Sequence, residues 1–220
     1  MTSVSAAYRL WSASYDRDPN PLLALEQRVL SDRLEVLPGE RVIDLATGTG
    51  RWLLHVLGGG GNGFGVDNSP EMLAQAAKKR GIAGRLICAD ALELPFPDGF
   101  ADLAICSFAL GYISPLDAAI REMARVARRI VLSDLHPNAV RAGWVRSFRT
   151  GGQKYEISHF DYSKCYINAC ARNAGLAPLW SLEAKFGEPE REIFERAGKG
   201  QEFESTKQVP AIFVGAWERQ

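Results

Sequence analysis

Short apolar runs alternate with longer helical patterns through the middle of the chain, and this alternation constrains the fold more than any other feature of the sequence. The runs are four to six residues long, as buried strands usually are, and they cover residues 41–46, 62–66, 85–89, 101–106 and 130–133. Between them the predicted crossover helices cover residues 51–57, 70–80 and 115–128. Strands that alternate with helices in this way indicate βαβ units and a parallel sheet.

The flanking segments predict further elements around this core. Apolar residues at helical spacing over residues 21–37 predict an amino-terminal helix that packs on the sheet and ends at Pro38-Gly39. The later elements are a helix over residues 163–173 and strands over residues 176–184 and 209–217. The mixed charge of residues 188–207 predicts a solvated hairpin or a short helix between the last two strands.

Length and charge narrow the class of protein. A chain of 220 residues is long enough for one α/β domain with appendages. Its 26 Lys and Arg residues balance 26 Asp and Glu residues, so the formal net charge is zero. Domains that bind the phosphate backbone usually carry a marked basic excess, so nucleic acid is disfavoured as a partner.

The sequence gives no sign of a membrane segment, a leader or a metal site. Its longest apolar stretch, residues 100–113, is shorter than the roughly 20 residues that a spanning helix needs. The first ten residues lack a basic segment followed by an apolar one, so we expect a cytoplasmic protein. The four cysteines have neither CxxC spacing nor a histidine at zinc-ligand spacing, which predicts reduced thiols and no bound metal.

The first predicted strand runs into a turn with two glycines, and residues 42–50 read VIDLATGTG. Glycines here allow a sharp turn into a helix and a close approach of the backbone to a nucleoside ligand. Gly48 and Gly50 meet this need, although any tight turn between a strand and a helix also favours glycine. Asp67 ends the second predicted strand, where a carboxylate accepts hydrogen bonds from ribose hydroxyls or caps the turn.

A third motif follows the third predicted strand. Residues 88–96 read CADALELPF, and residues 95–102 read PFPDGFAD. With the glycine turn and Asp67, this segment resembles the class I S-adenosylmethionine-dependent methyltransferases, in particular the small-molecule group similar to the ubiquinone and menaquinone methyltransferases. The resemblance covers about residues 41–133. The third motif separates the chain from the nicotinamide dehydrogenases, which share the first two motifs.

The resemblance implies cofactor contacts around the first strand. Asp44 is expected to orient the glycine turn or to bind the amino group of the methionine portion. Ala46 stands where the family most often has the first glycine of its motif. Gly48 and Gly50 follow, and the methionine portion is expected to lie on the backbone at Gly48.

The remaining cofactor contacts come from the next three strands. The resemblance implies that Asp67 holds the ribose and that Asn68 flanks the adenine. Asp90 and Ala91 are expected to read the edge of the adenine ring. Ser107 follows the fourth strand, where the family's backbone carbonyl meets the methionine ammonium group.

Two histidines are the candidates for a general base. A methyl group on a sulfonium is already activated, so the protein mainly aligns the nucleophile with the methyl carbon. A phenol, hydroxyl or acidic carbon would benefit from a base that titrates near neutral pH. His136 follows the fifth strand at the edge where open α/β proteins bind ligands, and His159 precedes a predicted helix. Either residue could instead stabilise a loop, whereas His55 is assigned to structure.

Two segments are expected to enclose the methyl acceptor. Residues 138–160 hold a long connection with aromatic and basic side chains, among them Trp144 and Arg146, and long connections often serve as lids. The amino-terminal pair Tyr8 and Tyr15 resembles the aromatic lid of many small-molecule members and would exclude water. Tyr112, beside the expected position of the methyl group, completes the predicted acceptor wall.

The sequence as a whole predicts a Rossmann-like α/β fold with a mostly parallel seven-stranded sheet, and the resemblance adds an antiparallel last strand. Residues 1–40 are expected to form a lid and a helix, and residues 41–220 the methyltransferase domain, with a cap over about residues 138–160. The expected reaction moves a methyl group from S-adenosyl-L-methionine to O, N or C of a small aromatic or anionic metabolite and leaves S-adenosyl-L-homocysteine. A monomer or homodimer is expected.

Two other functions stay open at this point. An RNA or protein methyltransferase is one, although no Asn-Pro-Pro-Tyr-type tetrapeptide follows the fourth strand, where residues 107–110 read SFAL. A non-catalytic S-adenosylmethionine-binding module that regulates a partner is the other.

Overall fold

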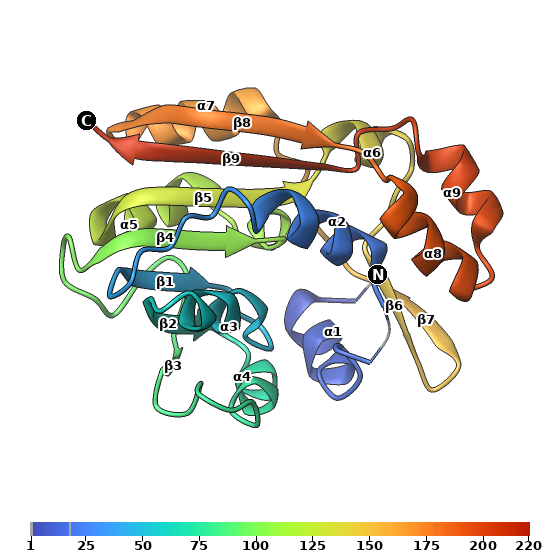
Figure 1. Ribbon diagram of the computed structural model, residues 1–220, viewed down its shortest axis with the longest axis horizontal. Coiled ribbons are helices and arrows are strands. Elements are labelled where there is room, and N and C mark those ends of the chain that lie inside the picture. Colours follow the sequence, from blue (N-terminus) through green and yellow to red (C-terminus); the bar gives the residue numbers. More distant parts are fainter. Residues whose placement is uncertain (1, 18) are drawn as a thin grey trace.

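The computed structural model describes residues 2–17 and 19–220, and its core is a seven-stranded sheet with helices on both faces (Figure 1). The strand order is β3-β2-β1-β4-β5-β9-β8. The strands are β1 (Arg41–Leu45), β2 (Asn62–Asp67), β3 (Leu86–Cys88), β4 (Ala101–Ser107), β5 (Ala127–Leu135), β8 (Leu176–Ala184) and β9 (Ile212–Arg219). All neighbours from β3 to β5 pair in parallel, and β9 runs antiparallel to both β5 and β8. The predicted fold class is confirmed.

Alternation along the strands places side chains on the two faces of the sheet. On β1, Val42 packs into one buried cluster and Ile43 into the other. Helices α5 (Leu116–Val126) and α7 (Lys164–Asn173) cover the face of Ile43. Helices α2 (Pro21–Leu30), α3 (Arg51–Gly58) and α8 (Glu188–Arg196) contribute to the cluster on the face of Val42. Both faces are therefore buried, as the continuous apolar strand sequences require.

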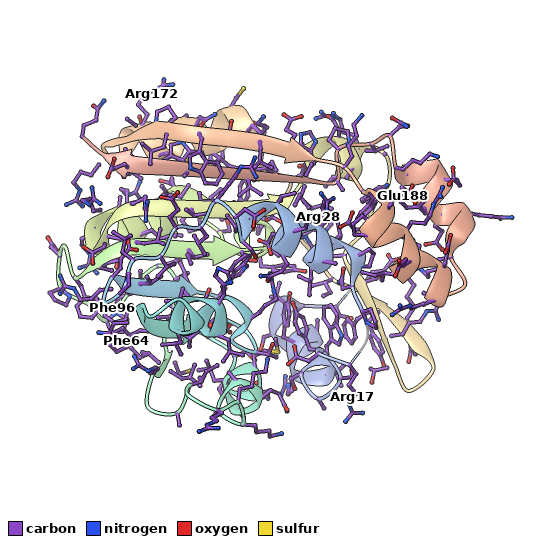
Figure 2. The ribbon with its side chains drawn as sticks, in the orientation of Figure 1. Arg17, Arg28, Phe64, Phe96, Arg172 and Glu188 are labelled. Carbon is purple, nitrogen blue, oxygen red and sulfur yellow. The ribbon has the colours of Figure 1, made fainter. Side chains whose placement is uncertain are left out.

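The segment after β3 packs beside the outer strands. Phe96, from the predicted third motif, lies against Phe64 of β2 with their ring centroids 6.2 Å apart (Figure 2). Helix α4 (Pro70–Ala76) begins at Ser69, whose side chain accepts a hydrogen bond from the backbone N–H of Met72. The predicted start of this helix is confirmed.

Two predicted helices are shorter than expected. Helix α2 ends at Leu30, not Leu37, with Ser31 at its C-cap, and residues 31–37 form a turn and an irregular segment. Leu34 still reaches the core from the turn that follows. Helix α4 ends at Ala76, not Arg80, because the chain bends to bury Ile82.

The predicted hairpin or single short helix over residues 188–207 is two helices, α8 and α9 (Gly200–Thr206). Phe194 and Phe203 are the buried residues that hold them together, with ring centroids 5.8 Å apart. The surrounding charges concealed this pair in the sequence. None of the helices within the described residues has the length and apolarity needed to cross a bilayer.

A roof lies beyond the carboxyl ends of the parallel strands, built from segments far apart in the sequence (Figure 1). Helix α1 (Val4–Trp11) packs against the hairpin of β6 (Ser147–Thr150) and β7 (Gln153–Glu156). The rings of Trp11 and Phe148 stack with centroids 4.9 Å apart. Helix α6 (Pro137–Arg141) connects β5 to this hairpin. The chain that precedes the first strand thus contacts the segment predicted as a cap.

Candidate functional site

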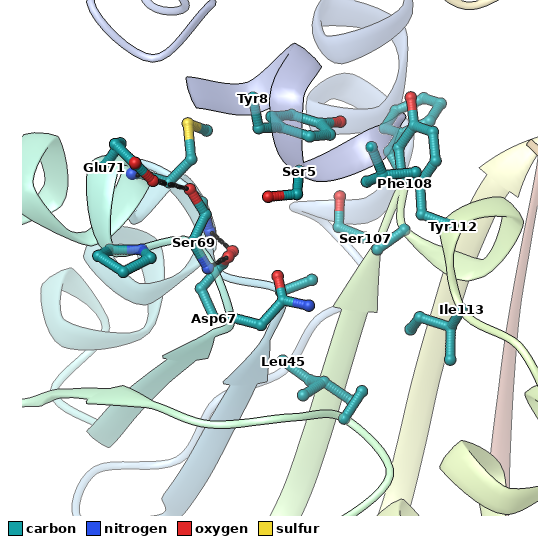
Figure 3. Close-up of a pocket in the computed structure, with 18 of the residues that line it drawn as sticks. Ser5, Tyr8, Leu45, Asp67, Ser69, Glu71, Ser107, Phe108, Tyr112 and Ile113 are labelled. Atoms are coloured by element: carbon teal, nitrogen blue, oxygen red, sulfur yellow. Dashed lines mark hydrogen bonds between the residues drawn. The ribbon is translucent and has the colours of Figure 1, made fainter. Parts of the chain in front are cut away.

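A cavity of about 320 Å³ opens at the carboxyl ends of β1, β2 and β4, below the roof. Figure 3 shows Asp67, Ser69 and Glu71 on one side of it, and Tyr8, Phe108 and Tyr112 on the other. In open α/β sheets this edge, where the strand order reverses, is where ligands bind. The cavity therefore combines a polar wall from the first strands with an aromatic wall from the roof and the segment after β4.

The turn after β1 forms the floor of the cavity. Ala46, Gly48 and Gly50 all adopt positive φ angles, of 53°, 57° and 82°. A Cβ atom on Gly50 would lie 2.6 Å from Cδ1 of Ile82, so a side chain here would have to displace that methyl group, and the positive φ itself favours glycine. Ala46 holds the same left-handed conformation with a side chain, which is strained for alanine.

Asp44 holds this turn from below. Its buried carboxylate accepts hydrogen bonds from the Thr47 hydroxyl at 2.6 Å and from the Leu53 backbone N–H at 2.9 Å. These contacts favour the first of the two predicted roles, orientation of the glycine turn. Burial raises the pKa of Asp44 from 3.8 to about 7.

The raised pKa predicts a pH-dependent stability. Between pH 3.8 and about 7 the folded protein holds a proton on Asp44 that the unfolded chain releases, so the free energy of unfolding falls as pH rises through this window. Asp44→Asn keeps an acceptor oxygen for Thr47 and Leu53 but cannot titrate. The free energy of unfolding of this variant should therefore fall less steeply with rising pH than that of the parent protein. Urea denaturation at several pH values measures both slopes, with exposed Asp117→Asn as control. Equal slopes for the variant and the parent would contradict the prediction.

Asp67 joins the two turns on the polar wall. One carboxylate oxygen accepts the Gly48 N–H at 2.8 Å, and the other accepts the Ser69 N–H, also at 2.8 Å. Burial raises its pKa, and the three backbone N–H groups around it oppose that rise. Asn68 lines the cavity beside it. The carboxylate keeps further lone pairs for a ligand, since each oxygen uses only part of its accepting capacity.

The third motif divides between the cavity wall and the surface. Ala89 and Ala91 line the cavity. Asp90 is exposed, does not line the cavity, and accepts a hydrogen bond from the backbone N–H of Leu92 at 2.9 Å. Its side chain stabilises the local turn, so the structure brings Ala91 to the site and leaves the predicted partner Asp90 outside it.

The aromatic wall comes from α1, from the segment that follows it and from the segment after β4. Tyr8, Tyr15 and Tyr112 line the cavity as predicted, and the rings of Tyr8 and Tyr112 meet edge to face at 5.5 Å. Burial raises the pKa of Tyr8 well above 10 and that of Tyr15 to about 12. Both phenols are protonated near neutral pH, so they can donate hydrogen bonds but cannot act as bases.

A second hollow of about 130 Å³ adjoins the cavity behind this wall. The two share Tyr8, Tyr15, Phe108 and Tyr112, whereas Trp144 and Arg146 line only the second. Trp144 stacks on Phe186 with ring centroids 5.6 Å apart. The predicted acceptor residues therefore gather around one aromatic space, which lies next to the cavity.

Arg146 is held in place at the second hollow. Its guanidinium forms an ion pair with Asp134, donates to the carbonyl of Phe108 at 2.9 Å and lies 4.6 Å over the Tyr112 ring. Its buried Nε–H has no acceptor among the described residues. These contacts connect the cap to the segment after β4 and leave the Nε–H group of Arg146 as a hydrogen-bond donor for a ligand.

Neither predicted catalytic histidine lies at these two spaces. His136 is buried and caps α6, where its Nδ1 accepts the Asn138 N–H at 3.0 Å and its Nε2 lies 3.3 Å from a Glu183 oxygen. His159 lies with its Nδ1 3.2 Å from the Ile157 carbonyl, at a separate small hollow. The predicted position of His136 at the sheet edge is correct, but its Nδ1 caps α6 and its buried Nε2 faces Glu183, away from both spaces.

Sequence reasoning missed a buried carboxylate behind the site. Glu26 of α2 is fully buried and pairs with Arg51, the first residue of α3. It also accepts hydrogen bonds from Ser107 at 2.7 Å, from Trp52 Nε1 at 3.2 Å, and from Ser133. The signal in the sequence was a glutamate directly beside Leu25, on the apolar face of a helix. Ser107, predicted at the cofactor, both lines the cavity and belongs to this network.

Comparison with known proteins agrees with this geometry. Residues 42–129 match a family model described as a methyltransferase domain. Demethylmenaquinone methyltransferases from Beutenbergia cavernae and Thermus thermophilus are each 37% identical, over 113 and 123 residues, covering 50% and 52% of this chain. The alignments cover 47% and 56% of those proteins, so the chain spans about half the length of the relatives it matches.

The fold has close structural counterparts. An S-adenosylmethionine-dependent methyltransferase from Mesorhizobium loti superposes with a TM-score of 0.70 at 20% identity, over 91% of this chain and 100% of that one. A second such structure, from Listeria monocytogenes, gives 0.69 at 15% identity, over 90% and 99% of the two chains.

Residues 42–129 match a methyltransferase domain, and the strand order and the glycine turn after β1 give the chain the fold of the S-adenosylmethionine-dependent methyltransferases. Over about half of its length, the chain is similar in sequence to the demethylmenaquinone methyltransferases of that class.

The cofactor of this class, S-adenosyl-L-methionine, fits the residues present. Asp67 offers acceptor oxygens at the polar wall, and a Cβ at Gly48 would lie 3.2 Å from Met72 Cε, so the glycine keeps the floor open. Ala89 and Ala91 give an apolar wall suited to a flat base. The cavity, at about 320 Å³, is in the range of small-ligand sites.

Proposed function

We propose that the chain transfers a methyl group from S-adenosyl-L-methionine to a small aromatic or anionic acceptor. The observation that carries this proposal is the second hollow, because it is aromatic, carries Arg146 and shares a wall with the cofactor-sized cavity. The relatives support a quinone-like acceptor, since they are named for demethylmenaquinone. The cofactor contacts predicted for Asp44, Ala46, Gly48, Gly50, Asp67, Asn68, Ala91 and Ser107 belong to this proposal.

When bound, the cofactor supplies a methyl group on a positively charged sulfur, which leaves as a neutral thioether. The residues of the chain align the cofactor with the acceptor and enclose both of them. Asp67 and the glycine turn fix the nucleoside end, while Tyr8 and Tyr15 exclude water from the aromatic side. Phe108 and Tyr112 line both spaces, so they set the direction in which the acceptor meets the methyl carbon.

The lining suggests an acceptor that needs no enzyme base. Among the described residues around the second hollow there is no histidine or carboxylate, and the acids of the main cavity, Asp67 and Glu71, lie on its polar wall. Burial keeps the pKa values of Tyr8 and Tyr15 high, so these two phenols stay protonated near neutral pH. A phenolate attacks unaided through its oxygen and has no proton left to lose. The electron-rich ring carbon of a hydroquinone attacks in the same way and then releases its ring proton to solvent.

Turnover with a defined panel tests the proposal. Purified protein, with S-adenosyl-L-methionine, should form S-adenosyl-L-homocysteine and a singly methylated product with a reduced short-chain demethylmenaquinone, simple phenols or aromatic carboxylates. Mass spectrometry detects both products. Methylation of RNA or protein alone, or tight cofactor binding without turnover of any acceptor in the panel, would contradict a small aromatic acceptor.

Trp144 offers a way to separate the two spaces. Trp144→Ala should lower kcat/KM for the acceptor about 10-fold, because an apolar contact in a pocket contributes roughly that much. Affinity for S-adenosyl-L-homocysteine should stay within about 2-fold of the parent value, since Trp144 lines only the second hollow. Trp180→Ala, on β8 and outside both spaces, is the matched control. An unchanged kcat/KM in Trp144→Ala would place the acceptor elsewhere, and a loss of cofactor affinity would mean that the two spaces are not separate sites.

A further inference from the structure

We propose that Arg51 binds the carboxylate at the amino-acid end of the cofactor, with Glu26 as the residue that positions its guanidinium. This inference rests on the proposed function, because it assigns a role within the same site. Neither residue belongs to the motifs from which the cofactor contacts were predicted. The argument uses the space beside Arg51, its hydrogen bonds and the charge of the ligand.

A third, small hollow of about 40 Å³ continues from the main cavity past the glycine turn. It shares Tyr15, Ala46, Gly48, Ser107 and Phe108 with the main cavity. The additional polar residues that line it near the turn are Asp44, Thr47, Thr49 and Arg51. A ligand that lies on Gly48 therefore has polar space for one of its ends.

The cofactor carries a carboxylate at that end, and its partner must be found nearby. Among the described residues that line the main cavity, none is an arginine, lysine or histidine. Arg51 is the cationic side chain of the adjoining hollow, and 29% of its side chain is exposed, so it is accessible. A planar guanidinium also matches a carboxylate in geometry, because it presents several N–H donors in one plane.

The contacts of Arg51 fix it before any ligand arrives. Its Nη2 donates to Glu26 and, at 3.0 Å, to Ser107, and its Nη1 donates to Gln27 Oε1 at 3.1 Å. The guanidinium carbon lies 4.9 Å over the ring of Trp52. A side chain held from three sides loses little freedom when a ligand binds.

Glu26 does not exclude a second anion. Its two oxygens also accept hydrogen bonds from Ser107, Ser133 and Trp52, so its negative charge is shared among several donors. The alternative is that Arg51 serves only to neutralise buried Glu26. A structural role of that kind would not distinguish between ligands with and without a carboxylate.

Calorimetric titration with two ligands tests this distinction. The ligands are S-adenosyl-L-homocysteine and its analogue in which hydrogen replaces the carboxylate. Arg51→Gln should weaken binding of the first by about 10- to 100-fold, as expected for charge-assisted hydrogen bonds, and binding of the second by less than about 2-fold. The affinity of Arg51→Lys for S-adenosyl-L-homocysteine should lie between those of the parent and of Arg51→Gln, because lysine retains the charge without the planar donors.

Control variants separate folding from binding. Arg51→Gln leaves buried Glu26 without its ion-pair partner, so the double variant Glu26→Gln with Arg51→Gln, which carries neither charge, is measured in parallel. It should show the same ligand selectivity. Arg121→Gln, on the exposed surface of α5, should bind both ligands as the parent does. Equal weakening for both ligands, or no weakening for either, would overturn the assignment. A parent protein that binds neither ligand would overturn the proposed function itself.

Discussion

Replacing Asp67 with alanine is expected to weaken binding of S-adenosyl-L-homocysteine by at least about 100-fold, since each hydrogen bond to a charged acceptor contributes about 1.5–3 kcal/mol. Two effects combine. The ribose would lose its acceptor at the polar wall, and the Gly48 and Ser69 N–H groups would lose the carboxylate that now links the two turns. The loss should therefore exceed that of removing one ligand contact.

Calorimetry on the purified variant measures this effect. Asp67→Asn retains one acceptor oxygen and should lose less affinity than Asp67→Ala. Asp117→Ala, which removes an exposed carboxylate on α5, should leave affinity unchanged. Thermal denaturation of each variant shows whether the fold is retained. Affinity of Asp67→Ala close to that of the parent would mean that the ribose lies elsewhere.

Glu26→Ala is expected to lower the free energy of unfolding by about 3–5 kcal/mol, the range found when one partner of a buried ion pair is removed. The carboxylate is fully buried and receives donors from α3, β4 and β5. Alanine would leave the Ser133 hydroxyl and the Trp52 N–H without this acceptor and open a space below α2.

Urea denaturation gives the free energy directly, and Glu26→Gln should be less destabilising because its amide oxygen still accepts hydrogen bonds. Glu192→Ala on α8 is the matched control, since Glu192 forms an exposed pair with Arg196, and such surface pairs contribute about 0–1 kcal/mol. A loss in Glu26→Ala no larger than in this control would mean that the buried network contributes little to stability.

Most of the fold could be predicted from the sequence because its strands are buried on both faces and therefore read as continuous apolar runs. The central strands Arg41–Leu45 and Ala101–Ser107 were predicted to within one residue at each end. Helix ends were less predictable where burial overrode local pattern. Residues after Ala76 read as helix, yet placing Ile82 in the core required the chain to turn.

The residues that line the cavity could be predicted where the position of the backbone alone brings them there. Gly48, Asp67 and Ala91 line the cavity because strand order alone brings the ends of β1, β2 and β3 together. The order of the strands places the backbone of a residue, but it does not determine the direction in which the side chain points. His136 lies at the correct edge of the sheet, but its ring turns to cap α6. Glu26 was missed because a charged residue in a helix is usually on its solvated face.

The walls of the two adjoining spaces come from different stretches of the chain, and this division affects how such a protein can diverge. Residues 41–76 supply the glycine turn and the polar wall, whereas Trp144 and Arg146 reach the second hollow from the cap. Substitutions within the cap alter one space and leave the β1 and β2 turns untouched. Under the proposed function, a lineage can exchange one methyl acceptor for another through substitutions in the cap alone, while the proposed site of the methyl donor is inherited unchanged.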